Sequence, residues 1–418
     1  MMVEAKRLVL RPTLDFEAAV TAWEDAGDST PLGRWLDREL DADGFPNQLS
    51  IPDWRQHLSR LAEARRGRNV DWPDLFDARI EGWFRQVLRF SRPDGDPVMC
   101  GGEGGPGTKE LLRYWAENLP DPSLETVLRW WFPTHERPHS PPPLPAAARL
   151  DLPLAVLRAH WQSAGDFVAI DHRQSGATTG LEMFALGRPW LGSKWGLEGS
   201  PAGSSAPAMT AWLSNSSLDL AEWSFKAGNL RVRRSALVLR HRKVAILGDE
   251  VEGGRSDPAM CIGLCQGVEA RPIEGSRALA LEGKRSRSSV RLYPFALPDT
   301  VSKSEDGVFE AVDGALRLQQ SSQLKRSWLP LLASWEPQRN RKTVRWRRLT
   351  VTERGEICPP STAIAYRISW GRDETLVIYR SLARPTLRAF LGHQSRSRFF
   401  VGLFDQNGNT KSILSLED

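Results

Sequence analysis

The chain from residue 160 onward constrains the fold most, because short apolar or alternating runs follow one another there without helical patterns between them. Gly, Pro, Asp and Asn, which favour turns, bound these runs. Residues 228–251 have the pattern of a hairpin turning near Arg240–Lys243, and residues 398–416 that of a hairpin turning at Asn407–Gly408. At least ten strands and no fixed-period repeat predict a large antiparallel β-sandwich over 159–418.

The first 135 residues have helical periodicity instead. Apolar residues between Pro73 and Gly95 recur at the spacing of one helical stripe, and shorter helices are expected within 107–120 and 123–133. The stripe comprises Leu75, Phe76, Ile80, Trp83, Phe84, Val87 and Leu88. Residues 136–158 begin with a Pro-rich run and are predicted to be a linker. The fold class is therefore α+β multidomain, with a short N-terminal helical domain (1–135) before the sandwich.

Composition and charge suggest the kind of ligand. The formal charge is +5 and the pI is about 9.1, a mild excess carried mostly by Arg that fits an anionic ligand. Seventeen Trp against four Tyr suits either sugar stacking or core packing.

The N-terminus lacks a secretory signal and no apolar run is long enough to cross a membrane. We expect a cytoplasmic protein without a membrane partner, or a periplasmic or secreted one if the start codon is misassigned.

Other motifs carry little chemistry. Cys261 and Cys265 have a zinc-like spacing without nearby further ligands, so buried free thiols are favoured. The glycine-rich segment 101–110 has Thr and Lys in the wrong order for a phosphate-binding loop. His135 and His139 lack the HExxH order, no G-x-S-x-G elbow occurs, and no nucleic-acid-binding signature is evident. We expect no metal, no cofactor and no nucleic-acid partner.

Residues 339–348 contain six basic residues around Trp346. If this segment is a strand, Val344 and Trp346 share one face while Arg345 and Arg347 share the other. Interleaved arginine and aromatic residues suit an anionic polymer. Arg345 and Trp346 are therefore candidate ligand contacts, and the alternative is a solvated face beside a buried one.

The segment 166–192 has the pattern of two strands around a polar elbow. Its second half, with Glu182 and Phe184 followed by the Gly-Arg-Pro turn of 187–189, resembles the heparinase II/III-like family of polysaccharide lyases. The hairpin of 230–253 and the Pro-Asp-Gly turn within 84–98 are also similar to that family. The resemblance implies a helical toroid domain joined to an antiparallel β-sandwich, and an acidic polysaccharide as the partner.

The first half of the segment departs from the family pattern. The family's catalytic histidine falls on Ser175, its following aspartate on Ala177 and its earlier histidine on Arg173. The helical region is also shorter than the family's toroid. The chain therefore resembles a degenerate member of the family.

β-Elimination at a uronate needs a group that neutralises the carboxylate, a base and an acid. His172 is the candidate base or acid, Tyr114 the candidate acid, and Arg173 the candidate carboxylate clamp. Substrate contacts are expected from Arg173, Trp190, Trp195, Arg345 and Trp346.

Three hypotheses remain, and whether the chain is an enzyme stays open. The first is a protein that binds or acts on acidic polysaccharide with a degenerate lyase site. The second is an active polysaccharide lyase with a rearranged site, and the third is a purely structural or interaction protein. An exposed line of Trp190, Trp195 and Trp212 favours a sugar-binding groove, whereas buried Trp residues and no cleft favour the structural protein.

Overall fold

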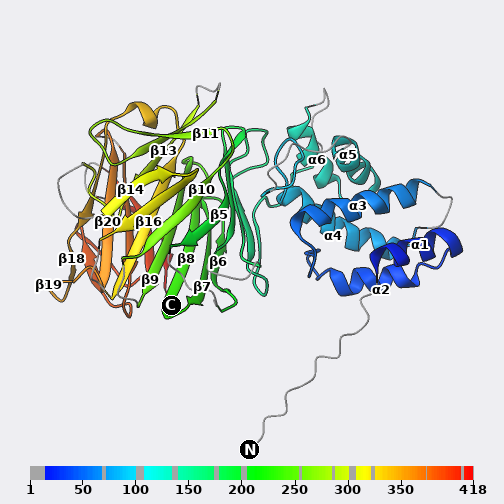
Figure 1. The fold of residues 1–418 in the computed structure, drawn as a ribbon, viewed down its shortest axis with the longest axis horizontal. Helices are drawn as coiled ribbons and strands as arrows, with labels where there is room; N and C mark the ends of the chain where they lie inside the picture. Colours follow the sequence, from blue (N-terminus) through cyan, green and yellow to red (C-terminus); the bar gives the residue numbers. More distant parts are fainter. Residues whose placement is uncertain are drawn as a thin grey trace, which may run out of the picture. The chain divides into compact units, whose positions relative to one another are not determined.

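The computed structural model describes residues 15–67, 72–99, 108–133, 140–173, 178–198, 205–253, 257–284, 288–300, 307–321, 325–372, 374–405 and 409–417. It divides into a helical unit, Met1–Pro97 with Gly104–Pro143, and a β unit, Val98–Glu103 with Leu144–Asp418. An α+β multidomain chain was predicted, and this is confirmed (Figure 1). None of the helices within the described ranges is long and apolar enough to cross a membrane.

The helical unit consists of helices that pack on their sequence neighbours, α1 on α2, α3 on α4 and α5 on α6, and α3 also packs on α1 and α5. Their bounds are α1 Phe16–Ala26, α2 Thr30–Glu39, α3 Ile51–Arg66, α4 Asp74–Arg89, α5 Thr108–Asn118 and α6 Pro122–Trp131. The stripe predicted on α4 is buried except for Leu75, which is 70% exposed because it lies on the same side of the helix as the exposed Ala78, three positions further on.

The described residues of the β unit form four antiparallel sheets, which we call the first to fourth sheets (Figure 1). The first sheet, in spatial order, is β1 Ala147–Arg149, β2 Leu154–Arg158, β3 Phe167–Asp171, β4 Gly180–Ala185, β5 Arg188–Leu197, β10 Ala259–Leu264, β15 Ala315–Gln320 and β14 Gly307–Val312. The second is β11 Val268–Pro272, β12 Leu279–Gly283, β13 Ser289–Pro294, β16 Arg326–Ser334, β9 Val244–Glu252, β8 Leu230–Leu239, β7 Leu218–Ala227 and β6 Ala208–Ser214.

Two smaller sheets complete the unit. The third is β17 Val344–Leu349, β20 Ala363–Trp370, β21 Glu374–Ser381, β24 Phe399–Phe404 and β25 Thr410–Leu416, and the 3-10 helix η1 Arg339–Arg341 precedes it. The fourth is β19 Glu356–Ile357, β18 Val351–Glu353, β22 Arg388–Phe390 and β23 His393–Ser395. The predicted hairpins correspond to β8–β9 and β24–β25; the Asn407–Gly408 turn lies outside the described residues.

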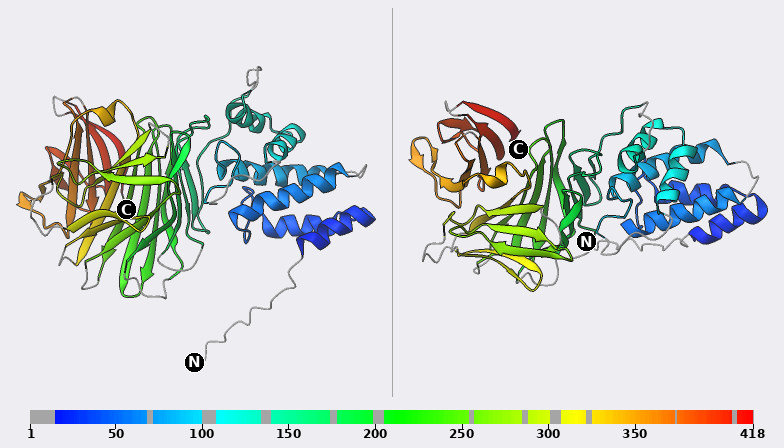
Figure 2. Two further views of the ribbon diagram at one scale, coloured as in Figure 1. Left: turned by 45° about the horizontal axis from the view of Figure 1, so that its top comes forward. Right: turned by 90° about the horizontal axis from the view of Figure 1, so that it is seen from above.

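Three apolar cores separate the four sheets, so the predicted sandwich has extra layers. One core joins the first and second sheets, another the second and third, and a smaller one the third and fourth. Figure 2 shows the C-terminal strands (orange to red) as layers beside the green strands of the second sheet. The second sheet is covered on both faces, which explains why β9 is apolar at consecutive positions rather than at alternating ones.

The boundary between the two domains differs from the predicted one. Residues 136–158 were expected to be a linker, but β1 and β2 lie within this range and pair with each other, and β2 pairs with β3. The apolar run of β2 is fully buried because it contributes to the core of the first sheet. The proline-rich run therefore ends before Ala147, and the β unit begins earlier than residue 159.

Coverage of both faces of β9 is testable with two adjacent residues. Ile246 packs between the second and third sheets, and Leu247 between the first and second. We expect Ile246→Ala and Leu247→Ala each to lower the free energy of unfolding by about 2–5 kcal/mol, measured by urea denaturation. Val312→Ala, on the 46% exposed Val312 of β14, should change it by less than about 0.5 kcal/mol. A small effect at either β9 position would contradict the layered arrangement.

Candidate functional site

His172 directly follows strand β3 and is buried. Its backbone N–H donates to the Pro153 carbonyl, and only 1% of its surface is exposed. Its ring lies 5.2 Å from the Trp223 ring and 5.6 Å from the Phe225 ring, both on β7 of the second sheet. The expected base therefore points into the core between the first two sheets rather than to the surface.

A hydrogen-bonded chain holds the His172 ring. Arg234 on β8 makes a two-pronged ion pair with Asp249 on β9, and both of its hydrogen bonds are 2.8 Å long. The side chains of the chain are all buried: His172, Thr179, Arg234 and Asp249. The Arg234 guanidinium also donates to the Thr179 hydroxyl at 2.5 Å and to the Trp195 carbonyl at 2.8 Å. Because the Thr179 oxygen accepts from Arg234, its own proton is available for His172 Nδ1, 2.7 Å away.

Both burial and charge keep the imidazole neutral. Burial lowers the pKa of His172 well below its ordinary value, and the Arg234 cation lowers it further. A neutral ring that accepts a hydrogen bond from the Thr179 hydroxyl is positioned as a structural acceptor. A base that removes a proton from a polymer must reach the substrate, and the burial of His172 does not provide that access.

Arg173, the candidate carboxylate clamp, is engaged by its own strand. Its guanidinium forms two hydrogen bonds with Asp171, at 3.0 and 2.8 Å, and its side chain is 16% exposed. An arginine already paired in this two-pronged way has little capacity left for a second carboxylate.

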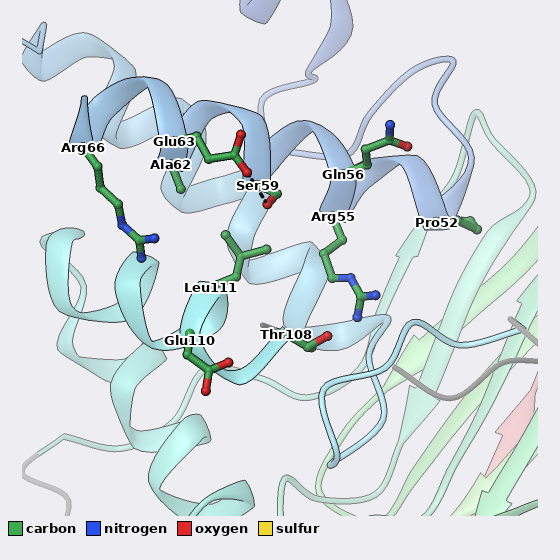
Figure 3. A pocket seen from close by; sticks show the side chains of 10 residues that line it. All are labelled: Pro52, Arg55, Gln56, Ser59, Ala62, Glu63, Arg66, Thr108, Glu110 and Leu111. Atoms are coloured by element: carbon green, nitrogen blue, oxygen red, sulfur yellow. Dashed lines mark hydrogen bonds between the residues drawn. The ribbon is translucent and has the colours of Figure 1, made fainter. Parts of the chain in front are cut away.

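Tyr114, the candidate acid, lies on α5 of the helical unit, whereas His172 and Arg173 belong to the β unit. The Arg66 guanidinium lies 4.1 Å from the centre of the Tyr114 ring, and burial raises the pKa of the phenol above its ordinary value. Arg66 also lines a groove of about 570 Å³ between α3 and α5, with Arg55, Glu63 and Glu110 (Figure 3). The phenol therefore lies beside a groove of mixed charge.

The three candidate tryptophans lie in the core. Trp190 and Trp195 are fully buried between the first and second sheets, and Trp346 is 2% exposed between the second and third. The indole N–H of Trp190 donates to the Ala185 carbonyl and that of Trp346 to the Leu297 carbonyl. These rings have no free face for a sugar. The hypothesis of a purely structural protein predicts buried Trp residues, as observed, but it also predicts that no cleft is present. The described residues do form grooves, which that hypothesis does not predict.

Arg345 on β17 is the predicted contact that is well exposed at the surface. Arg345 is 68% exposed and its nearest acidic partner, Asp299, is 3.5 Å away. Arg347 is exposed on the same face and lies directly opposite Arg367 of β20. Neither Arg347 nor Arg367 has an ion-pair partner in the part of the chain that the structure describes. Of the six basic residues in 339–348, Arg339 is instead buried, paired with Glu374 and stacked on Trp370.

Several other sequence motifs contribute no site within the described residues. Ser175, Ala177, His135, His139 and residues 100–107 lie outside the described ranges. Cys261 and Cys265 are half-buried. Among the residues that are described, no three His, Cys, Asp or Glu side chains come together in a way that would hold a metal ion.

Thr179, Arg234 and Asp249, which fix His172, were not predicted from the sequence. A signal for two of them was present, because Arg234 and Asp249 interrupt the apolar runs of a recognisable hairpin. If residues are paired outward from the turn at 240–243, Arg234 lies directly opposite Asp249, and the observed register has the same pair. Charged residues that face each other across a buried hairpin indicate an internal ion pair.

Comparisons with solved structures identify the fold. The structure is similar to one described as "Heparinase III-BT4657 gene product", with a TM-score of 0.62 and 12% identity over 88% of this chain and 64% of that one. Heparan sulfate lyase HepC from Pedobacter heparinus matches with a TM-score of 0.60 and 12% identity, over 88% and 65%. A third, described as heparinase III, matches with a TM-score of 0.60 and 13% identity, over 88% and 66%.

This chain thus has a heparinase III-like fold and is distantly related in structure to those proteins, while it spans about two thirds of their length. No protein-family model matches the sequence, and no curated protein does.

The buried neutral His172 predicts a specific pH dependence of stability. In the unfolded chain the imidazole takes up a proton below its ordinary pKa of 6.5, whereas in the folded protein it does not. Protonation therefore favours unfolding, and stability falls as the pH falls below 6.5, by up to about 1.4 kcal/mol per pH unit.

We expect His172→Gln to reduce this loss between pH 7.5 and pH 5, measured by urea denaturation at both pH values. Burial also raises the pKa of Asp166 from 3.8 to about 6, which opposes the loss of stability between these two pH values. The wild type and the variant both carry Asp166, so its effect cancels in the comparison. An equal loss in both proteins would show that His172 is not held neutral.

Proposed function

We propose that this chain binds an acidic polysaccharide through surface arginines and does not cleave it. The observation that carries the proposal is the arginine patch of the third sheet, formed by Arg345, Arg347 and Arg367, in which Arg345 alone has an acidic partner among the described residues, Asp299 at 3.5 Å. The solved proteins with a similar fold are described as heparinase III and heparan sulfate lyase, which supports an anionic polysaccharide as the ligand class.

The geometry of the patch suits a chain of sulfate and carboxylate groups. One face of the third sheet carries both apolar residues and the arginine patch. The fourth sheet packs on the apolar residues only, so Arg345, Arg347 and Arg367, with Ser369 beside them, lie outside the core between these two sheets. Like charges directly opposite across two strands destabilise a sheet unless a counter-ion neutralises them. Arginine presents a planar fork that matches the oxygens of a carboxylate or sulfate.

Loss of cleavage is supported by the surroundings of His172. Its ring is neutral, buried and hydrogen-bonded to Thr179, and Arg173 is paired with Asp171. Binding by the arginine patch needs neither residue. The proposal therefore assigns recognition to the third sheet and a structural role to His172.

Charge reversal tests binding. We expect Arg345→Glu and Arg347→Glu each to weaken heparin binding about 5–10-fold at moderate salt and to reduce the slope of log K against log[salt], measured by fluorescence titration. Arg271→Glu makes the same reversal at an arginine whose side chain is 62% exposed on β11, and it should change the affinity little. Wild-type protein that does not bind any acidic polysaccharide would support the purely structural alternative.

A lyase assay tests the absence of cleavage. We expect no ultraviolet absorbance from a new carbon–carbon double bond when the protein is incubated with a panel of acidic polysaccharides, with or without divalent metal. A signal that disappears in His172→Gln would establish the alternative, an active lyase in which His172 becomes accessible on binding.

A further inference from the structure

A second pocket lies on the β unit, beside strands β7, β8 and β9 of the second sheet. Its volume is about 460 Å³, within the range of about 300–1,000 Å³ that is typical of small-molecule pockets. The charged side chains that line it are Lys226, Arg231, Arg233, Glu250 and Glu252. None of these residues belongs to the arginine patch of the third sheet.

The register of the strands places two cations opposite each other in this pocket. Lys226 on β7 pairs directly with Arg231 on β8, so their side chains share one face of the sheet. The side chain of Arg231 is 72% exposed, and its ion pair with Glu252 is long, at 3.9 Å. Lys226 has no ion-pair partner within the described ranges. Two like charges in this arrangement repel each other unless an anion lies between them.

A buried ionic network lies next to the pocket. Arg380 of β21, which is 99% buried, pairs with Glu222 at 2.6 Å and with Glu250 at 2.9 Å. Arg398 also pairs with Glu222. Arg233 completes the network through Glu250 at 3.2 Å and Glu222 at 3.6 Å.

Cations outnumber carboxylates in the combined group. Arg326 bonds to Glu252 at 2.7 Å, so five arginines pair with the three carboxylates of Glu222, Glu250 and Glu252, and Lys226 is a sixth basic side chain beside them. Burial by itself would raise the pKa of Glu222, but Arg380 and Arg398 lower it below its ordinary value. Glu222 therefore stays ionised, and six basic side chains beside three carboxylates leave the group with a net positive charge. The buried Nη1 of Arg380 and the buried Nε of Arg233 also have no hydrogen-bond partner among the described residues.

We propose that this pocket binds a small molecule that carries a carboxylate or sulfate group, held between Lys226 and Arg231. Arg233 and the network next to it provide the positive potential that attracts the anion. The pocket can bind an oxyanion whether or not the protein binds a polysaccharide. We choose acidic sugars as the ligands to test, and this choice rests on the proposed function.

Titration of the full chain tests the pocket. Isothermal titration with sodium glucuronate, with N-acetylglucosamine 6-sulfate and with inorganic sulfate separates a carboxylate from a sulfate ligand, and glucose is the neutral control. We expect saturable binding of at least one of the three anions and none of glucose. No saturable binding of any of the three anions would overturn the proposal.

Variants place the binding in this pocket. Lys226→Ala combined with Arg231→Ala removes two exposed side chains and should raise the dissociation constant at least about 10-fold, with an unchanged circular dichroism spectrum. Arg271→Ala, on another strand of the second sheet, should leave it unchanged. Equal affinities of the wild type and the double variant would overturn the proposal.

Arg345→Glu separates this pocket from the polysaccharide site. We expect this variant to lose heparin affinity and to keep the affinity for the small anion. Loss of both would show that the anion binds at the patch and would overturn the proposal. If the wild type binds the small anion through Lys226 and Arg231 but binds no polysaccharide, the pocket is supported and the polysaccharide function fails alone.

Discussion

The β unit depends on how the β8–β9 hairpin accommodates charge inside a sheet that is buried on both faces. Arg234 pairs with Asp249 and the adjacent Arg233 pairs with Glu250. Because successive side chains point to opposite faces, the first pair enters the layer against the first sheet and the second pair the layer towards the third. A buried charge is costly unless it is paired. A register shift of one residue would separate both pairs, so the pairs select the register of the hairpin.

The same hairpin determines what chemistry is available. Arg234 holds Thr179, which holds His172 as a neutral acceptor inside the core. On the other face, Arg233 belongs to a network with more cations than carboxylates, next to a pocket. Proton abstraction is disfavoured on one face and anion recognition is favoured on the other. The proposed polysaccharide contacts, Arg345 and Arg347 of β17, lie on a separate exposed surface.

A heparinase III-like fold at about 12% identity is physically reasonable. The order of apolar runs and turns specifies the strands and their pairing, and many apolar residues satisfy the same pattern. Site chemistry depends on individual side chains and is lost with single changes. The shared architecture therefore identifies the fold, whereas function has to be argued from residues such as His172 and Arg345.

Local patterns alone determined the helices of the first 135 residues and the two hairpins, and they carry a signal, not used in the prediction, for the pairing of Arg234 with Asp249. These features depend on neighbours along the chain or on counting outward from a turn. The tertiary structure decided that four sheets stack, that Leu75 of the α4 stripe is exposed, and that Trp190, Trp195 and His172 are buried. The reason is that the alternation of apolar and polar residues along a strand shows that its two faces differ. Only the packing of segments that are distant in the sequence decides which face is covered.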